Sequence, residues 1–101
     1  MKDTAMTNDQ LLDARIRLGD DVLKREVGDE LILLDLKTEA YFGLNQSARA
    51  FVDGLAAGVP AGAAADAVAA QHEADATAVR EDMVALLREL LDAGLVNVVS
   101  R

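Results

Sequence analysis

Hydrophobic and polar positions along this 101-residue chain fall into short apolar blocks in the first half and into a helical repeat in the second. Three blocks, at residues 22–27, 31–36 and 40–44, are long enough for strands and too short for independent helices. Gly28-Asp29 separates the first two blocks, and glycine supplies the positive φ of a tight hairpin turn. The pattern therefore predicts a three-stranded antiparallel meander with one face on a core.

The apolar spacing changes to that of a helix after Asn45, whose side chain can cap a first turn. Four apolar residues then repeat at i, i+3, i+4 and i+7, namely Ala48, Phe51, Val52 and Leu55. An alanine-rich helix that buries little is predicted over residues 61–72, and a longer helix over 76–93 that ends at Gly94. The predicted fold class is α+β, with the three-stranded sheet followed by three helices.

The two ends of the chain have weaker patterns. Residues 1–13 are mostly polar and predict a disordered start. Residues 14–18 alternate and predict a short strand or an extended arm, while the apolar residues 95–99 could pack on the core or add a strand. We accordingly place a single domain at residues 14–97 and a C-terminal tail at 98–101.

Composition excludes several functional classes. The formal charge is −8, and no cluster of Lys and Arg is available for a phosphate backbone or an anionic membrane. The absence of cysteine excludes disulfides and thiolate metal sites. No apolar run approaches the roughly 20 residues of a membrane span, and the polar N-terminus is unlike a signal peptide. We expect a cytoplasmic protein with neither nucleic acid nor membrane as a partner.

The sequence offers little for catalysis. Its one histidine, His72, stands near Glu73 and Asp75 at a helix end, which is typical of a solvated histidine rather than of a metal ligand. Neither Ser47 nor Ser100 has a base placed beside it. We predict no catalytic residue, no metal and no cofactor, and hence a protein that is not an enzyme.

A binding surface has better support, from the strand at 40–44 and the helix at 76–93. The strand carries no charge and no proline, so at a sheet edge it would lack the usual defences against pairing with another chain. We expect Phe42 and Leu44 to face the core, and Tyr41 to lie outward or at the margin. The apolar stripe of the helix covers close to half its circumference, wider than packing on one core requires.

Two interpretations of the wide stripe are open. In the first, the helix is simply wedged between two elements of its own fold. In the second, the stripe is divided: Val79, Met83, Leu86 and Leu90 pack inward, while Val84, Leu87 and Leu91 line a groove with Arg80 and Arg88 on its rim. Such a groove suits an acidic, partly hydrophobic peptide that adds as a strand. The candidate peptide-binding residues are Ala40, Tyr41, Phe42, Gly43, Leu44, Arg80, Met83, Val84, Leu87, Arg88 and Leu91.

The run Leu33-Leu34-Asp35-Leu36, then Lys-Thr-Glu-Ala-Tyr-Phe-Gly-Leu-Asn, resembles the PqqD-like family, the precursor-peptide recognition elements of ribosomally made, modified peptides. The resemblance spans about residues 20–97. It implies a winged helix-turn-helix-like fold in which a leader peptide adds to the strand at 40–44 and lies against the helix at 76–93. It also implies two partners, the precursor and a leader peptidase or other modifying enzyme, and we expect a monomer or weak dimer.

Within the family the chain looks most like the stand-alone proteins of lasso-peptide clusters. One alternative is a peptide chaperone for a radical SAM enzyme of the PQQ pathway, although the cysteine usual in that member's first helix is absent: Val52 precedes Asp53-Gly54 here. A second is a winged-helix DNA-binding regulator, which the acidic charge opposes. A third is a dimerisation module that pairs through the 40–44 edge.

Overall fold

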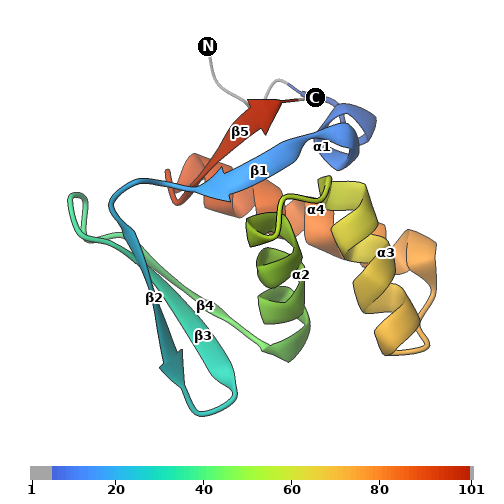
Figure 1. Ribbon diagram of the computed structural model, residues 1–101, viewed down its shortest axis with the longest axis horizontal. Helices are drawn as coiled ribbons and strands as arrows, with labels where there is room; N and C mark the ends of the chain where they lie inside the picture. Colours follow the sequence, from blue (N-terminus) through green and yellow to red (C-terminus); the bar gives the residue numbers. More distant parts are fainter. Residues whose placement is uncertain (1–5, 101) are drawn as a thin grey trace.

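The computed structural model describes residues 6–100, and it places a three-stranded sheet beside a block of helices, with a two-stranded ribbon across the other end (Figure 1). In chain order the elements are α1 (Asn8–Asp13), β1 (Arg15–Leu18), β2 (Val22–Val27), β3 (Glu30–Asp35), β4 (Tyr41–Leu44), α2 (Gln46–Ala56), α3 (Ala61–Gln71), α4 (Ala76–Asp92) and β5 (Val96–Ser100). The α+β class, with a three-stranded antiparallel sheet followed by three helices, is confirmed.

The sheet has the order β2-β3-β4, and both of its pairings are antiparallel. Val27 pairs with Glu30 across a two-residue turn in which Gly28 has a φ of 62°, as the predicted hairpin requires. The inner face of the sheet buries Leu31, Leu33 and Leu44, and it packs on α2. The meander is thus where the apolar blocks predicted it, with boundaries that differ by one residue.

The helices share one core with the sheet. Asn45 caps α2 as predicted, since its side chain accepts a hydrogen bond from the Ala48 N–H at 2.9 Å. α3 differs from expectation, because six of its eleven residues are buried. Small side chains let it approach α2 so closely that a Cβ on Gly54 would lie 3.0 Å from the Ala64 Cβ. The alanines therefore allow α3 to pack closely, and the expectation that this helix buries little is wrong.

The ends of the chain differ most from the sequence-based expectation. Residues 8–13 are not disordered but form α1, which a capping box between Thr7 and Gln10 starts and a fully buried Leu11 anchors. Residues 1–5, in the same predicted disordered segment, lie outside the described part of the chain. β5 pairs antiparallel with β1, so the C-terminal segment adds a strand and the fold continues past residue 97 to Ser100.

Candidate functional site

The turn that leads into β4 is held by a buried carboxylate. Asp35 is 8% exposed, and its Oδ1 accepts hydrogen bonds from the backbone N–H groups of Lys37 at 2.8 Å and Thr38 at 3.1 Å. The turn closes through Glu39, whose φ is 66° and whose N–H donates to the Asp35 carbonyl. The Asp35 N–H then donates to the Ala40 carbonyl at 2.8 Å, which fixes the register of the following strand.

The backbone of β4 presents half of its hydrogen-bonding groups to an open edge. The Ala40 carbonyl accepts a hydrogen bond from β3. Because such bonds alternate along an antiparallel ladder, the backbone N–H and C=O groups of Phe42 and Leu44 also point toward β3. The N–H and C=O groups of Tyr41 and Gly43 consequently point away from β3. Within residues 6–100 no strand pairs with this outer edge of β4.

The two edges of the sheet differ in their protection. β2, at the far edge, carries Lys24, Arg25 and Glu26 in consecutive positions. Charged side chains of this kind discourage pairing with a further strand. β4 reads Tyr-Phe-Gly-Leu and carries none. Charged side chains therefore protect the β2 edge of the sheet from pairing, and the β4 edge has no such protection.

The β4 side chains lie as the strand period predicts. Leu44 is buried and Phe42 is half-buried on the core side, whereas Tyr41 is 73% exposed on the opposite face. Gly43 is exposed on the same face as Tyr41, and Ala40 is half-buried in the turn before the strand. The five candidate residues from 40 to 44 thus form one continuous segment along the open edge.

The burial of α4 does not follow the predicted division of its stripe. Met83 and Leu90 are buried as expected, but Leu87, expected in a groove, is 0% exposed and lies in the core. The half-buried positions at one margin are Val79 and Leu86, which had been expected to pack inward. The reason is geometric: Leu87 lies near the middle of the apolar arc, and the middle of an arc is covered first.

The opposite margin of the stripe is covered by α3 and α1. Val84 is buried there, and Leu91, farther along that side, is half-buried. Val84 and Arg80 line a hollow of about 230 Å³ whose other residues are Asn8, Asp9, Leu12, Thr77 and Glu81. Two of the candidate residues on α4 are thus brought together, but beside α1.

The two arginines expected on the rim of the groove, Arg80 and Arg88, are hydrogen-bonded to other parts of the chain. Arg80 donates to both carboxylate oxygens of Asp66 on α3, at 2.7 and 2.6 Å, and these hydrogen bonds lower the pKa of Asp66 below its ordinary value. Arg88 donates to the Met6 carbonyl at 2.9 Å and to Asn8 Oδ1 at 2.7 Å. The two arginines therefore tie α4 to α3 and to the start of α1.

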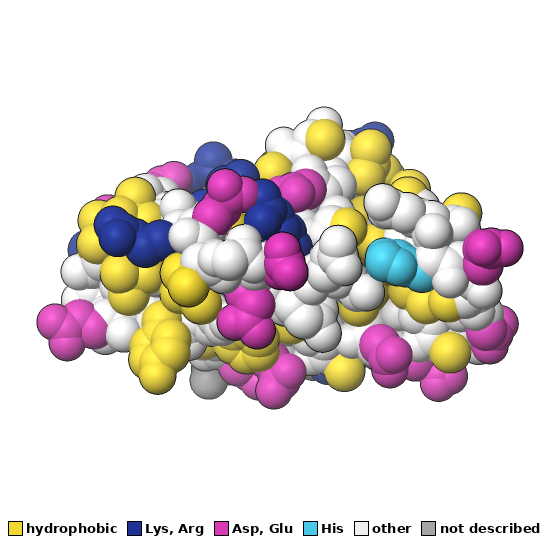
Figure 2. Space-filling view, turned by 90° about the horizontal axis from the view of Figure 1, so that it is seen from below, with side chains coloured by type: hydrophobic (Ala, Val, Ile, Leu, Met, Phe, Trp, Pro, Cys, Tyr) yellow, Lys and Arg dark blue, Asp and Glu magenta, His cyan; other side chains and the backbone are white. Residues whose placement is uncertain are grey.

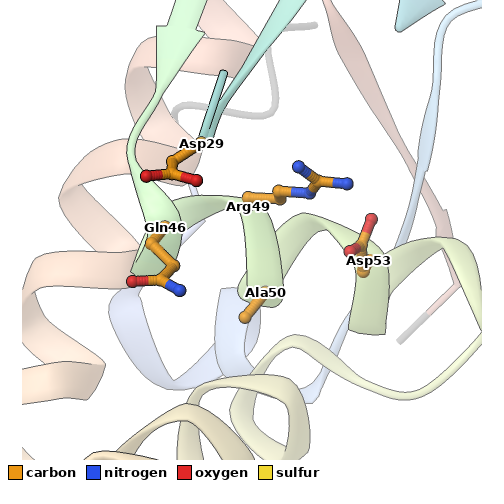
Figure 3. Close-up of a pocket in the computed structure, with 5 residues that line it drawn as sticks. All are labelled: Asp29, Gln46, Arg49, Ala50 and Asp53. Carbon is orange, nitrogen blue, oxygen red and sulfur yellow. The ribbon is translucent and has the colours of Figure 1, made fainter. Parts of the chain in front are cut away.

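A second hollow, of about 220 Å³, lies between α2 and the β2–β3 turn (Figure 3). Gln46, Arg49, Ala50 and Asp53 line it from α2, and Asp29 comes from the turn. Arg49 is ion-paired with Glu26 of β2. The lining is mostly polar, with charges of both signs, and none of its residues is among the candidate binding residues predicted from the sequence.

The described residues show no grouping of side chains that would form a metal centre. On the face in Figure 2, acidic side chains are spread from end to end, whereas the basic ones lie mainly at the left and in the upper middle among acidic neighbours. No group of three or more His, Cys, Asp and Glu among the described residues could hold a metal ion. His72 follows α3 at an exposed position. Across the same residues, no helix has the length and apolarity that crossing a membrane requires.

The fold and site define a small α+β domain whose sheet has one open, uncharged edge. The model of the family described as coenzyme PQQ synthesis protein D (PqqD) matches residues 30–96, and this chain belongs to that family. The family resemblance seen in the sequence is thereby confirmed.

Two solved structures are similar to the chain over most of its length. One is TbiB1 in complex with the TbiA(beta) leader peptide, with 30% identity, a TM-score of 0.73, and coverage of 80% of this chain and 94% of that one. The other is a lasso peptide synthetase B1 complexed with the leader peptide, with 25% identity, a TM-score of 0.75, and coverage of 83% and 99%. Among curated proteins, none matches significantly.

Proposed function

We propose that this protein binds the leader region of a ribosomally synthesised precursor peptide as an added strand on β4, and delivers it to a separate modifying enzyme or leader peptidase. Both similar structures are complexes with a leader peptide, which supports this role. One of them is a lasso peptide synthetase B1, and this favours a lasso-peptide pathway. The protein itself supplies recognition and no catalysis.

The observation that carries the proposal is the open edge of β4. The outward N–H and C=O groups of Tyr41 and Gly43 can pair with any extended backbone, and no charge on β4 repels one. Main-chain hydrogen bonds of this kind supply affinity, while side-chain contacts on alternate positions supply specificity.

The helix contributes the second surface in this proposal. Side chains of the peptide that point toward the core side would lie beside Phe42, and the half-buried margin of α4 at Val79 and Leu86 is the part of the apolar stripe left open to a peptide. The pattern of the stripe contained these two residues, but sequence reasoning had assigned them inward. The other candidates on α4 lie elsewhere: Met83 and Leu87 are buried in the core, and the side of the helix that faces α1 and α3 carries Arg80, Val84, Arg88 and Leu91.

A proline at position 43 tests the mode of binding. Gly43→Pro removes an N–H that points away from β3, and a Cβ there would lie 3.5 Å from Ile32 Cδ1, an ordinary contact. The matched control, Gly43→Ala, adds the Cβ and keeps the N–H. The probe is a fluorescein-labelled synthetic leader peptide of the lasso type, chosen by searching the neighbouring genes for a precursor, and it is titrated by fluorescence polarisation.

We expect micromolar or tighter binding by the natural sequence, at least tenfold weaker binding by Gly43→Pro, and a smaller loss for Gly43→Ala. Urea unfolding of all three proteins shows that each is folded at the temperature of the titration. Absence of binding to the natural sequence at micromolar concentration would overturn the proposed function. Equal affinities for the proline and alanine variants would refute strand addition at β4.

A role in the PQQ pathway is the second candidate, since the matching family is described by that synthesis. The two pathways differ in their precursor, so competition between a lasso-type leader and a PQQ-type precursor peptide for the same labelled site separates them. Preference for the PQQ-type precursor by tenfold or more would reverse the assignment. The neighbouring genes give an independent answer, because a lasso cluster encodes a peptidase and a cyclase.

A further inference from the structure

The outer face of the sheet, turned away from α2, carries an apolar row across all three strands. Leu23, Leu34 and Tyr41 are aligned by the register of the two pairings, and Leu23 and Tyr41 are 47% and 73% exposed. Hydrophobic side chains are visible at the sheet end of the molecule, at the left of Figure 2. The middle of β3, residues 31–34, is thus apolar on both faces, as strands with two covered faces are, although only the inner face is covered by the chain itself.

A notch in this face opens at the edge of β4. In the next row, Arg25, Ile32 and Gly43 are aligned, so the edge position carries no side chain. Ile32 is half-buried, and its Cδ1 would lie 3.5 Å from a Cβ at Gly43. No side chain on β4 therefore separates Ile32 from whatever lies beside position 43.

We infer that this part of the outer face is a specificity subsite for the bound peptide, formed by Ile32, Leu34 and Tyr41. The inference rests on the proposed function and deepens it. A strand added to β4 places the residues opposite Tyr41 and Gly43 on the outer face, because side chains alternate between faces with a period of two. These two positions of the peptide are separated by one residue.

The chemistry of the subsite indicates what the two positions hold. A large apolar or aromatic residue opposite Gly43 covers the notch and contacts Ile32, as aromatic side chains do across strand glycines. A residue opposite Tyr41 packs beside the phenol ring and extends the apolar row by one strand. The charged groups on this face, Arg25 and Glu30, have opposite signs, so no net charge selects the side chains.

The peptide is the occupant that the geometry favours. The subsite is continuous with the open backbone groups of Tyr41 and Gly43, so the strand bound there necessarily brings side chains to it. Leu23, at the other end of the row on β2, lies two strand spacings of about 4.8 Å each from β4 and is out of reach of those side chains. The same residue therefore provides a matched control.

The test compares Ile32→Thr, Tyr41→Thr and the control Leu23→Thr in titrations with the labelled leader described above. Threonine suits a strand, and Tyr41 is exposed enough that its replacement leaves folding intact. We expect five- to tenfold weaker binding for Ile32→Thr and Tyr41→Thr, and less than a twofold change for Leu23→Thr. In an alanine scan of the leader, substitution at two positions that are separated by one residue should weaken binding to the natural sequence. The same substitutions should weaken binding to Ile32→Thr by a smaller factor.

Several outcomes would overturn the inference. If the natural sequence binds the leader and all three variants bind equally well, the outer face has no role and the proposed function stands. If the natural sequence does not bind, the proposed function fails first. If peptide-free protein sediments as a dimer that Leu23→Thr and Tyr41→Thr both dissociate, the face is an interface between copies of this chain.

Discussion

Replacing Asp35 tests whether one buried carboxylate positions the edge strand. Asp35→Ala removes two hydrogen bonds, from the N–H groups of Lys37 at 2.8 Å and of Thr38 at 3.1 Å. A hydrogen bond to a charged group contributes about 1.5–3 kcal/mol when its partner is buried. Two such bonds would sum to about 3–6 kcal/mol, but Lys37 and Thr38 are exposed, so water replaces the lost acceptor in part and the expected loss falls below that sum. We expect a loss of about 2 kcal/mol in the free energy of unfolding.

That loss has two measurable consequences. In urea, the midpoint falls with little change in slope, and for a domain of this size the melting temperature drops by about 8–16 °C. Leader affinity also falls, even under conditions where the variant is almost fully folded, because β4 is no longer held at one position. Asp35→Asn keeps an acceptor oxygen, and we expect it to restore about half of the stability.

The control is Asp29→Ala in the other hairpin turn, where the side chain is exposed. This substitution removes the same kind of side chain from an exposed position, and it should change the free energy of unfolding by less than about 0.5 kcal/mol. If Asp35→Ala costs no more than Asp29→Ala, the turn is set by its backbone alone. If it costs stability but leaves leader affinity unchanged, the carboxylate supports the fold without positioning the binding edge.

Three further predictions concern the helices. Leu87→Ala should destabilise the fold by about 2–5 kcal/mol in urea while the folded fraction keeps its leader affinity; a selective loss of affinity would return Leu87 to the groove first expected. Arg88→Ala should speed hydrogen exchange at the Leu11 amide of α1 and leave α2 unchanged, since it removes the bonds that hold the start of α1; equal effects on both helices would contradict this. The lowered pKa of Asp66 means that its stabilisation is present at neutral pH and is lost as the pH falls below its ordinary value of 3.8; the stability difference between the natural sequence and Asp66→Asn should therefore shrink from pH 7 to pH 3, and a constant difference would refute it.

Features that depend on a few neighbouring residues were predictable from the sequence. The Gly28 turn and the Asn45 cap are local devices, and the structure contains both. The strand predicted at residues 31–36 was expected to reach Leu36, but that residue is 58% exposed and follows β3. The Asp35 side chain bonds to the residues after it and so starts the turn one position earlier than the apolar pattern suggests.

Features that depend on distant parts of the chain were not predictable. α1 contains too few apolar residues to show a helical stripe, yet Leu11 is buried in a core built from later elements. The width of the α4 stripe was visible in the sequence, but which margin stays open is decided by α1 and α3. Those helices cover the side of Val84 and Arg80 and leave Val79 and Leu86 half-exposed.

The open edge and the acidic charge are physically connected. An uncharged edge strand beside an exposed apolar face would pair with a second copy of the chain if only local contacts mattered. A formal charge of −8 on 101 residues opposes the approach of two copies, because the repulsion acts over the whole surface. A short peptide carries far less charge than a second copy and meets far less repulsion. The net charge is therefore a physical reason why an uncharged β4 edge would bind the proposed peptide rather than a second copy of the chain.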